Sequence, residues 1–523
     1  MARGLQQPGA VTRHLKLARW FIGIVGGTLA GLWIALLLVS REPNLQRKLI
    51  EALNDKLDAD VELESFEVRT FPTLRIHGEN LKLRLKDQKN PAPFIEIRHF
   101  EVSGGLFGLL RRQRQFSSVE LSGLRITIPP RTVDDKEAGK KTTDAAIGPV
   151  LIDLITAKDA ELIIVPKNPL KQPKVFAIHD LKLEGVGVNR TMPFVATLTN
   201  PLPKGEIATK GSFGPWVKRD PGLTPVNGTY AFNRADLNTI KGIAGILKSL
   251  GEFSGHLEEI DVKGTTETPD FSIDVGGTPM PLTTTFHAVV DGTNGDTYLK
   301  QVDGKLGGTA ISAAGAIESQ PGVKGRTVKL DVKIIEGRLE DVLKLAVKAK
   351  NPVMVGGIAL QAMLLLPPGE AKVLDRLQLD GRFALENTKF TDAAVQQKFT
   401  DLSRRAQGKK PEEPMGPVTS DMRGRFVMRD GAIRFNPMMF YLPGAEIELI
   451  GAYGLRSEAL DFSGRVALDA PISAAAGGGM KGFFLKAVDP IFRKDGKGAV
   501  IPITIKGPRE QPKFGVEWGK VFK

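Results

Sequence analysis

Apolar and polar residues alternate along most of the chain from Ala59 onward. In the segment LKLRLK, Leu81, Leu83 and Leu85 alternate with basic residues. The same period of two returns in four later segments, at Leu124 and Ile126, at Val328 and Leu330, at Ile447 and Leu449, and at Ile501 and Ile503. Strict alternation predicts strands with one apolar and one polar face, as in antiparallel sheets. We therefore expect a mainly β fold.

Three segments have helical rather than strand spacing. Apolar residues recur every four positions in residues 43–58, and every three or four positions near residues 233–250. Residues 391–417 predict a short helix followed by an exposed linker that holds basic residues and prolines. The chain is therefore expected to contain only a few short helices.

Three dipeptides between the alternating segments have the composition of two-residue hairpin turns. They are Asn227-Gly228, Asn294-Gly295 and Asp430-Gly431. We expect a hairpin at each.

A long sheet with one apolar face must cover that face. It can close on itself, stack on a second sheet, or curl into a gutter whose apolar interior admits acyl chains. The few predicted helices are too short to cover it, which favours self-closure or the gutter. Periodicity alone does not choose between them. The candidate lining residues are the apolar members of the alternating segments: Leu81, Leu83, Leu85, Leu124, Ile126, Val328, Leu330, Ile447, Leu449, Ile501 and Ile503.

The longest uncharged apolar run is Trp20–Val39, near the N-terminus. As a helix of about 20 residues it is about 30 Å long, the thickness of a bilayer's hydrocarbon core. Basic residues flank it on both sides, with a slight excess that favours a cytoplasmic N-terminus. A cleaved signal peptide is the alternative, but the run is long and no A-x-A-like site follows it. We expect an uncleaved single-pass anchor.

Small residues recur every four positions in this run, at Gly23, Gly27, Gly31 and Ala35. Such a stripe lies on one face of a helix and favours close packing against a partner transmembrane helix. The alternative is that glycine is simply common in membrane spans.

The amino-acid composition excludes several kinds of functional site. The 523 residues include no cysteine, which removes thiol catalysis, disulfides and zinc–thiolate sites. The net charge of +13 suits anionic lipid head groups, and we expect no nucleic-acid partner. The six histidines are scattered in the sequence, and no nucleotide-binding, nucleophile-elbow or metal-ligand spacing is present. We expect no enzyme activity, no catalytic residue, no metal and no cofactor.

The segment after the anchor and the C-terminal region resemble AsmA-like proteins. The resemblance rests on residues 53–84 (LNDKLDADVELESFEVRTFPTLRIHGENLKLR), on residues 100–130, and on residues 425–435 (RFVMRDGAIRF), 441–468 and 500–518. It covers most of residues 15–130 and 415–520. It implies a relative of TamB and the bridge-like lipid transfer proteins, with an elongated, curled antiparallel sheet that forms a groove and is tethered by one transmembrane helix.

The expected organisation combines the pattern with this resemblance. It comprises a cytoplasmic tail (1–16), the anchor (17–40), an AsmA-like N-terminal module (41–130), a central β-groove region (131–390), the helix and linker (391–417) and an AsmA-like C-terminal β region (418–523).

The function implied by the resemblance is transport of phospholipid between membranes. The chain would be anchored in the inner membrane, with its bulk in the periplasm, and would support assembly and integrity of the outer membrane. Two alternatives remain open. One is an assembly factor that binds outer-membrane proteins by strand addition. The other is an envelope polysaccharide enzyme with two converging carboxylates.

Overall fold

The computed structural model describes residues 50, 54, 59–69, 73–85, 93–105, 114–128, 150–164, 174–187, 189–201, 203–215, 217, 221–274, 278–292, 295–320, 323, 325–347, 349, 351–410, 413–469 and 499–516. The expected anchor (17–40), with Gly23, Gly27, Gly31 and Ala35, lies outside these residues, as does most of the expected helix 43–58. Among the residues that are described, no helix is both long enough and apolar enough to cross a bilayer.

The described part of the chain is mainly β, with three short α-helices, and its strands form an open sheet in which β25 pairs only with β24. Two compact units divide it. Strands β1 to β9 belong to unit 1, strands β15 to β25 belong to unit 2, and the strands between them contribute residues to both units.

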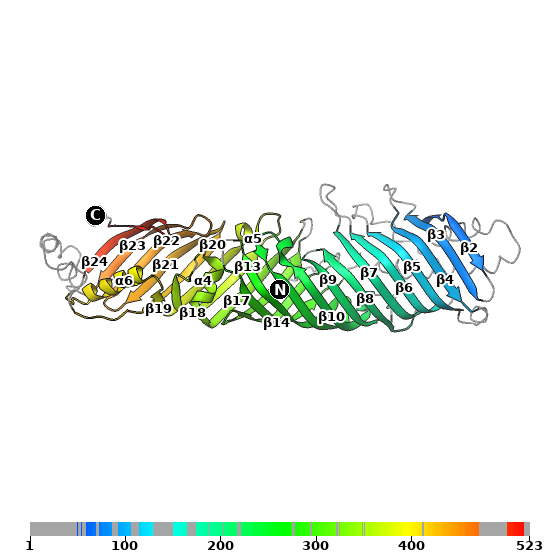
Figure 1. Cartoon of the computed structure of the whole chain (residues 1–523), viewed down its shortest axis with the longest axis horizontal. Helices are drawn as coiled ribbons and strands as arrows, with labels where there is room; N and C mark the ends of the chain where they lie inside the picture. Colours follow the sequence, from blue (N-terminus) through cyan, green and yellow to red (C-terminus); the bar gives the residue numbers. More distant parts are fainter. Residues whose placement is uncertain are drawn as a thin grey trace, which may run out of the picture. The chain divides into compact units, whose positions relative to one another are not determined.

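Unit 1 contains neighbouring strands that Figure 1 labels β2 to β9. Their bounds are β1 Ala59–Glu62, β2 Ser65–Arg69, β3 Leu74–Leu85, β4 Ile95–Gly104, β5 Arg114–Ile128, β6 Val150–Ile164, β7 Lys174–Gly187, β8 Met192–Pro201 and β9 Lys204–Phe213. Both β1 and β2 pair with β3, and each later strand pairs with the next. All these pairs are antiparallel except β5 and β6, which are parallel.

The intervening strands are β10 Pro225–Asp236, β11 Ile243–Ala244, β12 Ile246–His256, β13 Glu259–Ile273 and β14 Met280–Val290. The helix expected near residues 233–250 is wrong, because this segment is the end of β10, a single 3-10 turn (Leu237–Thr239), β11 and the start of β12. Gly242 and Gly245 have φ of +105° and +129°, which no right-handed helix accommodates.

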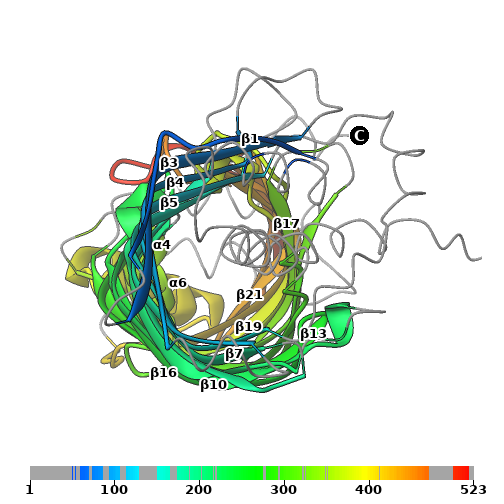
Figure 2. The same ribbon diagram turned by 90° about the vertical axis from the view of Figure 1, so that its right-hand side faces the viewer.

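Unit 2 continues as antiparallel strands, each paired with its neighbour in sequence. The strands are β15 Thr297–Leu306, β16 Thr309–Ser319, β17 Arg326–Arg338, β18 Met354–Leu366, β19 Gln378–Phe390, β20 Ser420–Arg429, β21 Ala432–Leu442, β22 Ala445–Gly454, β23 Ala459–Leu468, β24 Ala499–Pro508 and β25 Lys513–Val516. The helices are α4 Leu339–Ala346, α5 Val373–Arg376 and α6 Ala393–Ala406. Figure 2 shows β17, β19 and β21 following a curve rather than a plane.

The predicted hairpin turns have different outcomes. Asp430 and Gly431 connect β20 to β21 with φ of +53° and +69°, the left-handed pair that a type I′ turn requires, and this prediction is confirmed. The turn predicted at Asn227-Gly228 is wrong, because both residues lie inside β10. A Cβ on Gly228 would lie 2.9 Å from the Cα of Gly211 in β9. Glycine at this position therefore allows the backbones of β9 and β10 to approach each other closely.

Candidate functional site

The sheet of unit 2 has two chemically different faces. On β17, Val328, Leu330 and Val332 are half-buried, whereas the residues between them, such as Lys329 and Lys333, are exposed. This confirms the alternation read from the sequence for this segment. Because side chains on a strand point alternately to opposite sides, the apolar residues share one face.

The ladders align these apolar residues into rows that cross unit 2. One row takes a single residue from each strand from β15 to β25: Val302, Ala313, Val332, Ala362, Gly381, Phe426, Phe435, Gly451, Phe462, Ile505 and Phe514. A second row runs from β15 to β24: Leu299, Gly315, Leu330, Leu364, Leu379, Met428, Ile433, Tyr453, Leu460 and Gly507. Neither row contains a charged residue.

The opposite face of the same strands is charged. Arg382 of β19 lies between Gln361 of β18 and Arg425 of β20, and its Nη2 donates to the Gln361 side chain over 2.7 Å. Arg465 of β23 pairs with Glu448 of β22 over 2.5 Å. Unit 2 therefore has a polar surface behind an apolar one.

Short helices cover parts of the apolar face. Leu339 of α4 joins the buried cluster of Ile334, Met354 and Ile358, with Val342 packed against it. Leu374 of α5 packs with the second row at Met428. α6 supplies Phe399, whose ring stacks on Phe390 at a centroid separation of 4.5 Å and lies 5.3 Å from the ring of Phe440.

Polar contacts fix α4 and α6 in these positions. Asp341 of α4 is 3% exposed and accepts hydrogen bonds from the Gly308 amide at 2.9 Å and the Thr309 hydroxyl at 3.0 Å. Asp392 caps α6 by accepting from the Val395 amide at 2.9 Å. Ser403 of α6 donates to the Pro443 carbonyl at 2.6 Å. The hydrogen bonds of Asp341 and Ser403 thus connect α4 and α6 to the sheet and its loops.

The covering is uneven along the rows. Phe426 and Phe462 are buried, whereas Leu299, Leu330 and Leu364 are half-buried. The part of the apolar face on β15 to β18 around Leu330 and Leu364 thus keeps solvent-accessible apolar surface. We call this region the apolar strip.

The sequence-predicted lining residues of unit 2 all lie on its apolar face, but not in equivalent surroundings. Val328 and Leu330 belong to the strip. Ile447 and Leu449 are 7% and 8% exposed and lie within the cluster that α6 covers. Across β23, Val466 lies between Ile447 and Ile501, and Gly464 lies between Leu449 and Ile503. Ile501 and Ile503 are half-buried against the same cluster.

The predicted residues of unit 1 lie in one buried cluster. Leu81, Leu83 and Leu124 are at most 6% exposed, and Ile126 packs against them. In the ladder of β3, β4 and β5, Ile97 lies between Leu81 and Leu124, and Ile95 lies between Leu83 and Ile126. Leu85 is opposite Ala59, and its side chain is outside the description. In unit 1 these side chains contact one another, as in an ordinary protein core.

A line of irregular positions crosses the sheet of unit 1. Asn80 of β3, Gly123 of β5 and Asp159 of β6 have φ of +52°, +65° and +51°. At this point, each of these strands has two consecutive residues that face outward. The residues on either side of them, such as Gly78 and Leu81, are three positions apart and both face the buried side. Extra residues on the polar face bend a sheet around its apolar face. No pattern in the sequence predicts this line.

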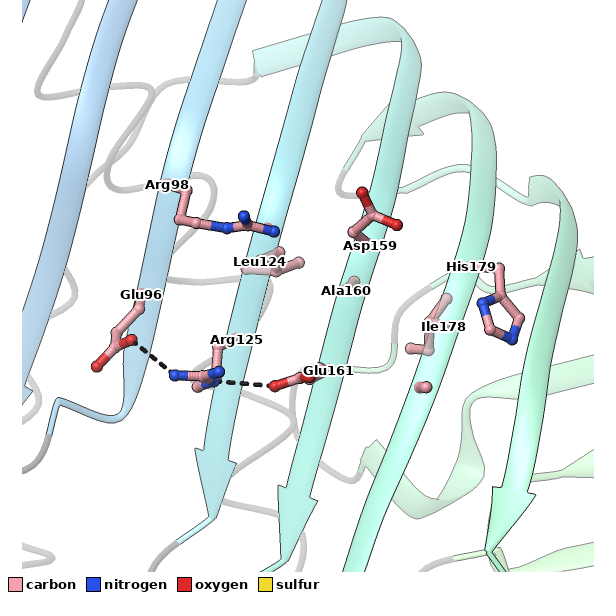
Figure 3. Close-up of a pocket in the computed structure, with 11 residues that line it drawn as sticks. Glu96, Arg98, Leu124, Arg125, Asp159, Ala160, Glu161, Ile178 and His179 are labelled. Carbon is pink, nitrogen blue, oxygen red and sulfur yellow. Dashed lines mark hydrogen bonds and ion pairs between the residues drawn. The ribbon is translucent and has the colours of Figure 1, made fainter. Parts of the chain in front are cut away.

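A pocket of about 420 Å³ opens along this line on the polar face (Figure 3). Arg125 lies between two carboxylates, 3.4 Å from Glu96 and 3.0 Å from Glu161. Arg98 extends from β4 over Gly123, where a Cβ would lie 2.6 Å from the guanidinium carbon. Glu96 and Glu161 each form an ion pair with Arg125, so both carboxylates are already engaged. Charged side chains line this pocket beside Leu124 and Ile178, and their charges do not suit an acyl chain.

The structure also brings together residues that the sequence leaves scattered. His77, Glu79 and His99 form a cluster on the polar face of β3 and β4. These residues are up to 22 positions apart and match no short sequence motif. Only the strand register could have revealed the cluster.

The chain was compared with known proteins at the level of sequence and of fold. No family model, no curated protein and no solved structure matches it.

Proposed function

We propose that this chain is a membrane-anchored lipid transfer protein and that the apolar strip of unit 2 shelters the acyl chains of phospholipids. The observation that carries the proposal is the half-buried state of Leu330 and Leu364, in the middle of charge-free rows on a sheet whose other face is charged. Large aliphatic side chains that retain accessible surface in a contiguous patch are typical of binding surfaces.

The width of the strip supports this assignment. From β15 to β18 there are three steps of about 4.8 Å, which gives about 14 Å. The acyl region of one leaflet is about 15 Å thick, half of a 30 Å bilayer core. The strip therefore matches the size of the acyl region of one lipid. Each buried CH₂ contributes about 0.8 kcal/mol, which offsets much of the cost of leaving a bilayer.

The wider role follows the resemblance to AsmA-like proteins and the apolar run Trp20–Val39. The chain is anchored in the inner membrane with a cytoplasmic N-terminus, and its β units lie in the periplasm. There it passes phospholipid between the two membranes and supports the integrity of the outer membrane. Alkaline phosphatase fused to the C-terminus would be active in this orientation, and an inactive fusion with normal expression would contradict it.

Site-specific photocrosslinking tests the lipid contact directly. A benzophenone amino acid replaces Leu330 or Leu364 in the full-length chain, and the matched control replaces Met363, which is 63% exposed on the other face of β18. After irradiation of cells with radiolabelled phospholipid, we expect label on the chain at positions 330 and 364 but not at 363. Equal labelling at all three positions, or none, would contradict the proposal.

A further inference from the structure

Two histidines and two glutamates form a square on the polar face of unit 1. His77 of β3 is directly opposite Glu101 of β4, and Glu79 is directly opposite His99. The two histidines therefore lie on one diagonal and the two glutamates on the other. All four positions are paired across β3 and β4, and Glu79 and His99 lie next to the irregular position at Asn80.

The side chains converge in this square. The His77 and His99 rings are 4.3 Å apart between centroids, at an interplanar angle of 78°. Nδ1 of His99 is 3.9 Å from Oε1 of Glu79, and Nδ1 of His77 is 3.9 Å from Oε2 of Glu101. One ligand atom from each of His77, Glu79 and His99 lies within 4.8 Å of the other two.

These separations are close to those of a metal site. Ligands at about 2.05 Å from a tetrahedral zinc ion are about 3.3 Å from one another. Small side-chain rotations would close the remaining gap, and all three side chains are partly exposed. Two imidazoles and one carboxylate are a common ligand set for Zn²⁺ and leave a fourth position to water.

Glu101 completes the arrangement. It contacts His77 at 3.9 Å and Arg75 at 4.0 Å. A carboxylate beside a ligating histidine orients its ring and raises its basicity. Glu101 is thus placed as the orienting partner of His77.

We propose that His77, Glu79 and His99 bind one divalent transition-metal ion, with Zn²⁺ as the best match to the ligand set. The ion joins β3 to β4 on the face opposite the buried cluster of unit 1. The proposal is independent of lipid binding, because it involves neither the apolar strip nor unit 2.

Equilibrium dialysis of the metal-free full-length chain against Zn²⁺, with metal counted by mass spectrometry, tests the site. We expect one ion per chain in the wild type and an affinity lower by about tenfold or more in His77→Ala, His99→Ala and Glu79→Gln. The matched control is His179→Ala, which removes another exposed histidine of unit 1, one whose ring nitrogen lies 2.9 Å from the Thr199 hydroxyl. This control should bind Zn²⁺ as the wild type does.

A second readout separates a site from adventitious binding. Co²⁺ bound by two imidazoles and a carboxylate gives a visible absorption band, which should appear in the wild type and in His179→Ala but not in His77→Ala or His99→Ala. Circular dichroism confirms that each variant is folded. Wild-type affinity in folded His77→Ala and His99→Ala, or the absence of saturable binding in the wild type, would overturn the proposal.

Discussion

Leu330 and Leu364 face each other in register across β17 and β18, and both remain half-buried. Their neighbours in the same row, Gly315 and Leu379, extend the apolar contact to β16 and β19. Leu379 is held under α5 by Leu374, whereas Leu330 and Leu364 belong to none of the buried clusters of the described residues. The pair therefore lies in a part of the apolar face that keeps accessible surface outside the helix-covered clusters.

Substitution of Gly78 tests the packing of unit 1. Gly78 is opposite Phe100, and a Cβ on it would lie 2.6 Å from Cε1 of that ring. Because the ring is buried and cannot move freely, Gly78→Ala should destabilise the β3–β4 pair by about 1 kcal/mol, the low end of overpacking costs. Hydrogen exchange of β3 and β4 amides measures this loss. Gly105→Ala, where nothing lies within 4 Å of the added carbon, should leave exchange unchanged, and equal effects would refute the packing account.

The capping residue of α6 offers a second test. Asp392→Ala removes the acceptor for the Val395 amide and should cost about 1 kcal/mol, which is about a fivefold increase in exchange of the α6 amides. Asp392→Ser retains an acceptor and should restore most of the protection. If the alanine variant shows wild-type exchange, the cap does not hold α6 against the sheet.

Alkaline pH should weaken unit 1 through Tyr230. Burial raises the pKa of this phenol, and a hydrogen bond to Ser249 at 3.1 Å lowers it in part. Because the folded-state pKa is above the unfolded value of about 10, the stabilisation is complete below pH about 10 and is lost as pH rises through the folded-state pKa.

The comparison uses Tyr230→Phe. In this variant, the free energy of unfolding should fall less steeply above pH about 10 than in the wild type. Chemical denaturation at a series of pH values measures the slopes, and parallel curves for the two proteins would contradict a role for Tyr230.

Much of the fold follows from the period-two pattern, because each strand with one apolar face carries its own signal. Val328 and Leu330 lie together on one face, and Ile447 and Leu449 lie on the same face of a later strand. The short helix expected within 391–417 corresponds to α6, whose apolar residues follow an Asp cap. What the pattern could not supply is coverage: Leu330 and Leu449 have the same local sequence signal, yet α6 covers only the second.

The failures have physical causes. Between residues 233 and 250, apolar residues recur at helical spacing, but Gly242 and Gly245 adopt left-handed conformations that direct the chain into strands. Asn227-Gly228 has the composition of a turn, but its glycine is used for close strand approach. The cluster of His77 and His99 depends on the register of two strands, which local sequence does not encode.

The most direct test of the central claim uses two adjacent residues of β18. Leu364→Lys places a charge on the apolar strip, whereas Met363→Lys places the same charge on the exposed opposite face. The measurement is the number of phospholipids that remain bound to the purified full-length chain, counted by native mass spectrometry. We predict bound phospholipid in the wild type and in Met363→Lys and a loss of most of it in folded Leu364→Lys. Equal phospholipid on Leu364→Lys and Met363→Lys, or a wild type that carries none, would contradict the account.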